Sequence, residues 1–312
     1  MSPTFERVDD LAGVADRQPT YLAIGVFDGV HRGHQHLLQT MVAEARQAGA
    51  RPAVLTFFPH PRAVIQNLSG RLYLTTLERR VDLLAQQGPE LVIVQSFDEE
   101  LRTTRAVDFV ERLCQALDLR QLWGGSFSLG YKREGDAEFL RRLGRDRGFT
   151  VRLMDDLVTW EGGRVSSSRI RRALSEGNIA EVNGCLGRPF CVSGMVYRGD
   201  RRGKQIGFPT ANLTVWEQQL LPANGVYATY ARLGEERFAA ATNVGVRPTV
   251  NGTVLSVEAH LLDFDRDIYD QELVLEFVAR VRDERKFSGL DALKAQIAAD
   301  IAEIEALLVP ER

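Results

Sequence analysis

The pattern of apolar runs changes once along this 312-residue chain, and that change constrains the fold more than any other feature. Before about residue 184, short strand-like runs alternate with segments of helical spacing. The predicted strands are 21–26, 53–57, 91–94, 121–123 and 151–154. The predicted helices contain Leu37–Ala45, a segment opened by the capping pair Thr75 and Glu78, Val107–Leu117 and Phe139–Leu143. Strands joined by helices predict right-handed crossovers and a parallel, doubly wound sheet.

After residue 184 the chain consists mainly of strand-like runs with little helix between them. These runs are 191–197, 211–215, 226–233, 238–244, 254–262 and 273–281. Six short strands at close spacing predict an antiparallel barrel or sandwich. A closing helix is predicted from the capping pair Ser288 and Asp291 and from one apolar face, formed by Leu290, Leu293, Ile297, Ile301 and Ile304. We therefore predict two domains, residues 1–183 and 184–312.

Composition excludes several classes of protein. The formal net charge is −3, which argues against binding nucleic acid through bulk positive charge. The three cysteines are too few for a disulfide framework and lack the CxxC spacing of a thiolate zinc site. No apolar run approaches the ~20 residues that cross a bilayer, and the N-terminus carries Glu6, Asp9 and Asp10 where a signal peptide would be basic and then apolar. We expect a cytoplasmic protein with neither nucleic acid nor membrane among its partners.

Residues 25–36 form the first candidate site, because they follow the first predicted strand and open the first helix. Three of the five histidines lie here, and two of them, His31 and His34, flank Gly33. In a doubly wound sheet the strand-to-helix turn is where phosphates bind, because free N–H groups and the positive end of the helix dipole point there. A zinc cluster and a plain tight turn are the alternatives. The zinc cluster is disfavoured because no cysteine or carboxylate follows at ligand spacing.

The pattern Gly25-x-Phe27-Asp28-Gly29-x-His31-x-Gly33-His34 resembles the HxGH signature of nucleotidylyltransferases. It is most similar to the form found in bacterial bifunctional riboflavin kinase/FAD synthetases. The resemblance implies that His31 and His34 contact ATP phosphates, within a site that the residues of this pattern form. It also implies that His60 and Arg62, in the segment Pro59-His60-Pro61-Arg62, border the flavin and nucleotide pocket.

A run of hydroxyls, Ser166, Ser167 and Ser168, precedes Arg169 and Arg171 and matches a further segment of this family. Hydroxyls that cap a helix with arginines in its first turn suit a triphosphate. The alternative is an ordinary capped surface helix.

The chain departs from the family pattern on the loop after the fourth predicted strand of the first domain. The family usually has Gly-x-Asp/Asn-Phe-x-Phe-Gly, whereas this chain has Ser126 in place of the carboxylate or amide and Leu129 in place of an aromatic residue. Phe58 also stands where the family often has aspartate. We nevertheless expect Ser126 to line the nucleotide site.

The second candidate site is the segment from Gly203 to Asn212. A Gly/Lys loop precedes a rigid proline, after which Thr210 and Asn212 alternate on an emerging strand and so point to the same face. A hydroxyl and an amide oxygen side by side are hard oxygen ligands, which suit Mg²⁺ that also holds ATP phosphates. The segment lacks the GK[ST] arrangement of a Walker A loop. Taken alone, it could also be a simple turn into a strand.

The sequence Gly207-Phe-Pro209-Thr210-Ala-Asn212 is similar to the riboflavin kinase signature, and further family segments follow at 222–227, 243–249, 257–260, 267–269 and 280–287. The resemblance implies that Glu258 is the general base for the riboflavin 5′-hydroxyl and that Thr210 and Asn212 hold Mg²⁺. It implies that the substrate-binding and nucleotide-binding residues are Gly203, Lys204, Gly207, Pro209, Asn243 and Arg247.

Together these matches cover residues 20–300 and imply an α/β protein. Its Rossmann-like nucleotidylyltransferase domain has a parallel sheet and is followed by a six-stranded antiparallel β-barrel riboflavin kinase domain with a C-terminal helix. The expected function is phosphorylation of riboflavin to FMN and adenylylation of FMN to FAD, with ATP, riboflavin and FMN as substrates and Mg²⁺ as cofactor. We expect only small-molecule partners and a monomer or weak homo-oligomer. The alternatives are a riboflavin kinase whose first domain has weak or lost adenylyltransferase activity, and a non-catalytic flavin-binding regulator.

Overall fold

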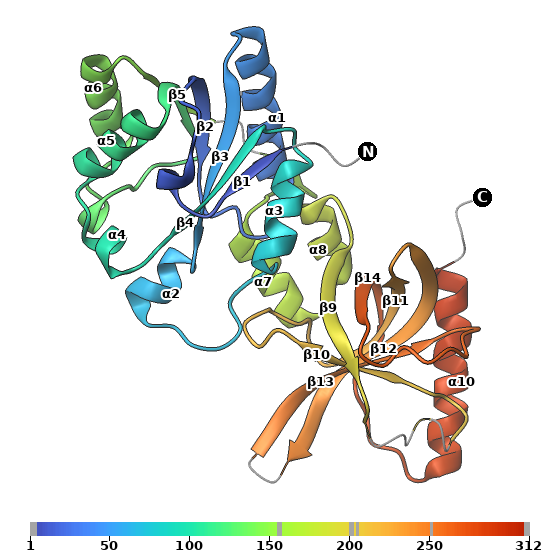
Figure 1. Cartoon of the computed structure of the whole chain (residues 1–312). Coiled ribbons are helices and arrows are strands. Elements are labelled where there is room, and N and C mark those ends of the chain that lie inside the picture. The colour runs from blue at the N-terminus through green and yellow to red at the C-terminus, as the bar shows by residue number, and fades with distance from the viewer. Residues whose placement is uncertain (1–4, 155–157, 200–202, 204–205, 250–251, 309–312) are drawn as a thin grey trace. The chain divides into compact units, whose positions relative to one another are not determined.

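The computed structural model describes residues 5–154, 158–199, 203, 206–249 and 252–308. The chain divides into two compact units (Figure 1). The sheet unit contains the chain up to Leu72 together with Thr76–Val165, and the barrel unit contains Tyr73–Thr75 and the chain from Ser166 onward. The predicted domain boundary at residues 183 and 184 stays a prediction.

The sheet unit is built on a parallel sheet with the strand order β1-β4-β3-β2-β5-β6 (Figure 1). Its strands are β1 (Glu6–Val8), β2 (Pro19–Ile24), β3 (Arg51–Phe58), β4 (Leu91–Ser96), β5 (Asp118–Gly124) and β6 (Thr150–Leu153). The five strands predicted for this half are confirmed. The short edge strand β1 was not predicted, because three residues carry too little apolar periodicity to be recognised.

Helices cover both faces of this sheet. They are α1 (Arg32–Gln47), α2 (Pro61–Gln66), α3 (Leu77–Ala85), α4 (Glu99–Thr103), α5 (Ala106–Ala116) and α6 (Ala137–Arg147), with short 3₁₀ turns at Leu11–Gly13 and Tyr131–Arg133. Neighbouring strand residues alternate between the two cores: Ala23 and Val54 pack with α1 and α3, whereas Leu22 and Leu55 pack with α5. A two-stranded ribbon of β7 (Thr159–Trp160) and β8 (Gly163–Arg164) follows. The doubly wound fold is thus confirmed.

One predicted helix cap is wrong by a residue. The residue that caps α3 is Thr76, whose hydroxyl accepts a hydrogen bond from the Arg79 N–H at 3.2 Å. Thr75 instead belongs to the barrel unit.

The barrel unit contains a closed antiparallel barrel with the order β10-β13-β12-β11-β14-β9. Its elements are α7 (Ser167–Glu176), α8 (Ile179–Leu186), β9 (Phe190–Tyr197), β10 (Ala211–Val215), β11 (Gly225–Leu233), β12 (Glu236–Thr249), β13 (Gly252–Leu261), β14 (Glu272–Arg282) and α10 (Leu290–Leu307). All six strands match the predicted runs, and they form a closed barrel and not a sandwich.

The helix α10 packs on the outer face of this barrel (Figure 1). There Ile304 and Leu308 contact the buried side chains of Val226 and Ala228. The Arg282 guanidinium on β14 holds the helix through hydrogen bonds of 2.7–3.0 Å to the buried Asp300 carboxylate. The predicted Ser288 cap is wrong: Gly289 occupies the cap position without a side-chain hydrogen bond. Leu290 is also 53% exposed, because it precedes the part of the helix that meets the barrel.

The segment Tyr73–Thr75 is integrated into the barrel unit by backbone hydrogen bonds. The Tyr73 N–H donates to the Gln218 carbonyl at 3.0 Å, and the Leu220 N–H donates to the Tyr73 carbonyl at 2.8 Å. The Tyr73 ring packs against Trp216, with ring centroids 4.9 Å apart. Both Tyr73 and Leu74 are almost fully buried. Tyr73, which is remote in sequence, thus forms a β-type bridge with Gln219 in this unit.

Residues 166–183 also contribute to the barrel unit, which predicts a difference between two fragments. The Asn183 amide donates to the Phe277 carbonyl and accepts from the Phe190 N–H, both at 2.8 Å. A fragment of residues 184–312 loses both hydrogen bonds and the buried apolar side chains of Ile179 and Val182 on α8. Compared with a fragment of residues 166–312, we expect its free energy of unfolding to be lower by at least about 2 kcal/mol. Urea unfolding followed by circular dichroism measures this difference, and equal midpoints would contradict it.

Candidate functional site

The carboxyl ends of three adjacent parallel strands bring the first group of predicted residues to one edge of the sheet. The strand order places β2 between β3 and β5. The turn at 25–31 follows β2, His60 and Arg62 follow β3, and Ser126 follows β5. In an open α/β sheet, ligands bind outside the carboxyl ends of the strands. The fold therefore gathers these predicted residues where such a sheet binds its ligand.

The turn from β2 to α1 has an unusual backbone. Phe27, Gly29 and Val30 all have positive φ, at +51°, +84° and +37°. Glycine adopts this region freely, whereas a phenylalanine or a valine there is strained. Phe27 and Val30 are nevertheless buried, so packing must hold the turn in this form.

The two signature histidines lie in direct contact at the start of α1. Their rings stack with centroids 3.6 Å apart and planes inclined by 16°. His31 is the N-cap residue, and its Nδ1 accepts a hydrogen bond from the His34 N–H at 3.3 Å. Because Nδ1 is the acceptor, the neutral His31 ring carries its proton on Nε2. Nε2 is then a hydrogen-bond donor of the kind that a phosphate oxygen accepts.

Gly33 is needed beneath the His31 ring. A Cβ at this position would lie 3.2 Å from His31 Cε1 and 3.3 Å from His31 Nδ1, closer than most such contacts in proteins. Gly25 is crowded in the same way, because a Cβ there would lie 3.0 Å from the Phe27 ring. These two glycines therefore serve the packing of the aromatic rings in the turn.

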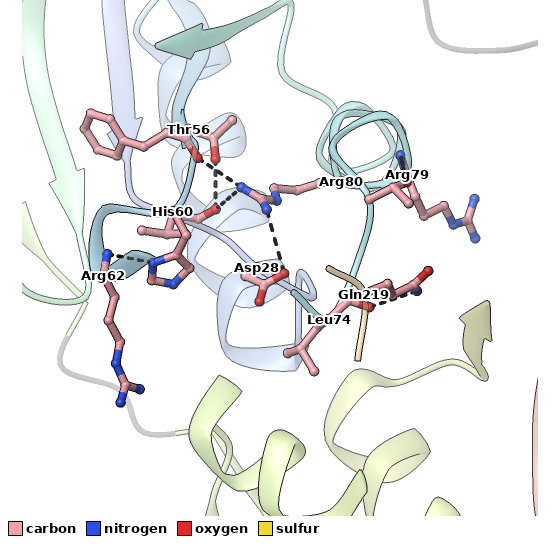
Figure 2. Close-up of polar contacts among 11 residues, drawn as sticks. Asp28, Thr56, His60, Arg62, Leu74, Arg79, Arg80 and Gln219 are labelled. Atoms are coloured by element: carbon pink, nitrogen blue, oxygen red, sulfur yellow. Dashed lines mark hydrogen bonds and ion pairs between the residues drawn. The ribbon is translucent and has the colours of Figure 1, made fainter. Parts of the chain in front are cut away.

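Asp28 is buried beside an arginine that the sequence analysis did not identify. Its Oδ1 lies 3.8 Å from Nη2 of Arg80, and the two side chains are 2% and 0% exposed (Figure 2). Arg80 stands three residues after Leu77 and four before Leu84, which places it on the apolar face of α3. A lone arginine on an apolar helix face is the sequence signal that could have revealed it.

His60 and Arg62 have local partners on α2. His60 caps this helix through Nδ1, which accepts from the Arg62 N–H at 3.0 Å (Figure 2). The Arg62 guanidinium donates to the Gln66 side chain at 3.0 Å. Ser126 is exposed, whereas the neighbouring Phe127 is buried in the sheet core. The roles of these residues toward a ligand stay predictions.

The serine run lies in the barrel unit, at the start of α7. Ser166 is the N-cap, and its hydroxyl accepts from the Arg169 N–H at 3.2 Å. Arg169 forms an ion pair with Glu181 of α8, with Nε and Oε1 2.6 Å apart. Ser167 and Arg171 are half-buried, and Ser168 is exposed. The predicted hydroxyl-capped helix is present, and its binding of a triphosphate stays a prediction.

In the barrel, strand register brings three predicted side chains into one row. Asn212 on β10 pairs with Glu258 on β13, and Glu258 pairs on its other side with Asn243 on β12. Directly paired residues project from the same face of a sheet. The row lies on the outer face, since Asn243 also pairs with Val226, which packs against α10. Two amides therefore flank one carboxylate, with Asn212 buried and Glu258 half-buried.

The segment before β10 brings Thr210 close to this row. The Pro209 carbonyl lies 2.6 Å from Nδ1 of His260, two residues beyond Glu258. A Cβ on Gly203 would clash with the Phe208 carbonyl oxygen and would lie 3.3 Å from the Thr210 hydroxyl, so the loop folds back on itself there. Gly207 has a φ of +94°. Lys204 lies outside the described residues, and Arg247 pairs with Val254 in the β12–β13 ladder.

A second carboxylate borders the row. A Cβ on Gly245, two residues from Asn243, would clash with Oε1 of Glu284, so this carboxylate lies over the Gly245 backbone. Glu284 belongs to the segment 280–287, which the sequence analysis noted without assigning it a role.

Comparisons with known proteins match both halves of the chain. Residues 14–169 match the family model described as FAD synthetase, and residues 186–308 match the one described as riboflavin kinase. A solved structure titled as a macrolide-efflux protein from Streptococcus pneumoniae superposes with a TM-score of 0.86 at 27% identity, covering 97% of this chain and 99% of that one. In the described part of the chain, no helix is both long and apolar enough to span a membrane.

Curated relatives match across both halves at once. The chain is 38% identical over 290 residues to the bifunctional riboflavin kinase/FMN adenylyltransferase of Escherichia coli strain K12, covering 92% of each chain. It is 37% identical over 282 residues to the protein of that name from Listeria monocytogenes, covering 89% of each. The Bacillus subtilis protein of that name is 32% identical over 289 residues, with 91% of each covered. The chain belongs to the family of bifunctional riboflavin kinases/FMN adenylyltransferases.

Proposed function

We propose that this protein makes FAD from riboflavin in two ATP-dependent steps. The barrel unit phosphorylates riboflavin to FMN, and the sheet unit joins FMN to AMP and releases pyrophosphate. The observation that carries this proposal is the match of both halves, in one chain, to relatives that are named for both activities. Riboflavin, FMN and ATP are then the substrates. A cytoplasmic location and the absence of nucleic-acid partners stay predictions from composition.

In the kinase reaction, the riboflavin 5′-hydroxyl attacks the γ-phosphorus of ATP and ADP leaves. Such a transfer needs in-line positioning and a proton acceptor more than a covalent nucleophile. We assign the acceptor role to Glu258. The assignment is supported by its half-burial on the outer barrel face and by the two amides beside it, Asn212 and Asn243, which can orient a carboxylate or a substrate hydroxyl.

We propose Thr210 and Asn212 as the residues that hold Mg²⁺. The donor set fits this ion, because a hydroxyl and an amide oxygen are hard ligands and a carboxylate lies one strand away. Bound Mg²⁺ neutralises charge on the ATP phosphates and so favours phosphoryl transfer. Asn212 is 6% exposed, so its amide is partly fixed by packing before any ligand arrives.

In the adenylyl transfer, an FMN phosphate oxygen attacks the α-phosphorus of ATP. The new P–O bond forms as the bond to the pyrophosphate breaks, so the protein need not supply a nucleophile. His31 and His34 are assigned to the departing pyrophosphate, whose growing negative charge a ring N–H can stabilise. The acceptor role of His31 Nδ1 supports this assignment, because it leaves the proton on Nε2.

The function is tested by giving the protein riboflavin and MgATP and separating the flavins by chromatography. We expect FMN and then FAD. A variant with His31→Ala and His34→Ala should stop at FMN, with FAD formation lowered by more than 10³-fold, because two donors of ~2.7–4 kcal/mol each are lost. Equal loss of both activities in a folded variant would contradict the division into two sites.

Glu258→Gln tests the kinase assignment. The amide keeps the shape of the side chain but cannot take a proton at neutral pH, so turnover to FMN should fall by ~10²–10⁴. Adenylylation of supplied FMN should stay within twofold. Glu276→Gln is the matched control: it changes another barrel-strand glutamate, which is paired with Arg237, and should leave turnover within twofold. Near-normal turnover of the Glu258 variant would make this residue structural.

Gly33→Ala tests the packing of the histidine pair. The added methyl group must push the His31 ring away, since it would lie 3.2 Å from Cε1. We expect FAD formation to fall by at least tenfold while FMN formation continues. In the control Gly13→Ala, the new Cβ meets Val8 only at an ordinary 3.4 Å, and FAD formation should stay within twofold. Unchanged FAD formation in Gly33→Ala would show that the ring can shift without loss.

A further inference from the structure

Arg80 is a charged residue that no step described so far uses. Its side chain is fully buried in the sheet unit. Nη1 donates to the Val26 carbonyl at 3.2 Å and to the Phe57 carbonyl at 3.1 Å, while Nη2 lies 3.8 Å from Asp28 Oδ1 (Figure 2). Burying a guanidinium costs free energy unless it is paired and hydrogen-bonded. All three contacts are made at the carboxyl edge of the sheet.

These contacts fix the start of the strained turn. The Val26 carbonyl accepts from Arg80 and also from the Thr56 hydroxyl, the latter at 2.8 Å. The next residue, Phe27, has the positive φ that a phenylalanine avoids. The Val26 carbonyl is held by two hydrogen-bond donors, and Asp28 is held by its ion pair with Arg80. With both neighbours fixed, Phe27 cannot easily return to a negative φ.

The same turn leads into the two histidines at the start of α1. The Phe27 ring packs edge-on against His34, with centroids 5.2 Å apart, and His34 stacks on His31. A change in the Val26–Asp28 backbone must therefore move the rings. The guanidinium of Arg80 also places a positive charge beside the Asp28 carboxylate, beneath the turn proposed to bind phosphates.

We propose that Arg80 is a positioning residue for adenylyl transfer, holding the turn so that His31 and His34 face the phosphates. The inference rests on the proposed function of the sheet unit. It predicts that the loss from removing Arg80 falls on the turnover of FMN to FAD and not on riboflavin phosphorylation, which belongs to the barrel unit.

The experiment compares Arg80→Met with Arg51→Met in the full-length protein. Arg51 is a matched control: it is 6% exposed, lies at the opposite end of β3 and donates through Nη2 to the Asp16 carbonyl at 3.0 Å. Each variant is assayed for kcat and KM of FAD formation, for riboflavin phosphorylation and for thermal unfolding. For Arg80→Met we expect kcat of FAD formation to fall at least 30-fold, with the KM for FMN within threefold and phosphorylation within twofold.

Arg51→Met should lower the unfolding temperature but leave kcat of FAD formation within threefold. The proposal is overturned if Arg80→Met keeps kcat within threefold of the unmodified protein, or if both variants lose it equally. If the unmodified protein itself forms no FAD from FMN and MgATP, the proposed function fails instead.

Arg80→Lys keeps the inference testable if the methionine variant does not fold. Lysine retains the charge but lacks the planar fork that reaches two carbonyls at once. We expect kcat to fall threefold to tenfold, against less than twofold for Arg51→Lys. If Arg80→Lys and Arg51→Lys both stay within twofold of the unmodified protein, while Arg80→Met does not fold, Arg80 is a stability residue only.

Discussion

The proposed kinase site depends on the register of β13 between β10 and β12. Backbone hydrogen bonding pairs Glu258 with Asn212 on one side and with Asn243 on the other. Because side chains alternate between faces, a slip of one residue would turn Glu258 inward and bring the buried Val257 and Ala259 to the surface. The apolar residues of β13 therefore oppose a one-residue slip, which would disperse the polar row. The pairing of β13 with β10 and β12 thus determines both the packing of the core and the geometry of the site.

The proposed adenylyl-transfer site depends on a different constraint, the anchoring of one turn. Parallel strands β3, β2 and β5 end at the same edge, but this alone does not orient two imidazoles. Orientation comes from buried contacts: Phe27 against His34, His34 against His31, and Arg80 beneath Val26 and Asp28. The barrel site is thus fixed by regular strand pairing. The sheet site is fixed by the buried contacts of Arg80 with the irregular turn after β2.

This difference explains what the sequence could predict. Periodicity indicated the barrel strands and the main sheet strands because each buries a regular apolar pattern. The cap at Thr76 was missed by one residue, since Thr75 offers the same side chain. The cap of α10 was missed because Gly289 caps the helix without a side-chain hydrogen bond, next to a serine of the type that usually caps helices. The pairing of Tyr73 with the barrel was not predictable, because it joins segments about 145 residues apart with no local pattern of their own. Arg80 was missed because a helical arginine is ordinarily exposed.

The loop after β5 carries the two departures from the family pattern, Ser126 and Leu129, and its packing shows what they affect. Leu129 exchanges backbone hydrogen bonds with Gly135 at 2.8 and 3.0 Å, and its side chain packs against the sheet core. Phe127 lies against Gly124, where a Cβ would come within 2.9 Å of its ring. These contacts set the loop without Ser126, which is exposed. Ser126 therefore differs from the family's carboxylate or amide in the chemistry of one exposed group, while the contacts of Phe127 and Leu129 hold the loop. If Ser126 lowers adenylylation, we expect the loss to come from the missing hydrogen bonds of that one side chain, each worth about 0.5–1.5 kcal/mol, against the ~2.7–4 kcal/mol expected of each donor in the histidine pair.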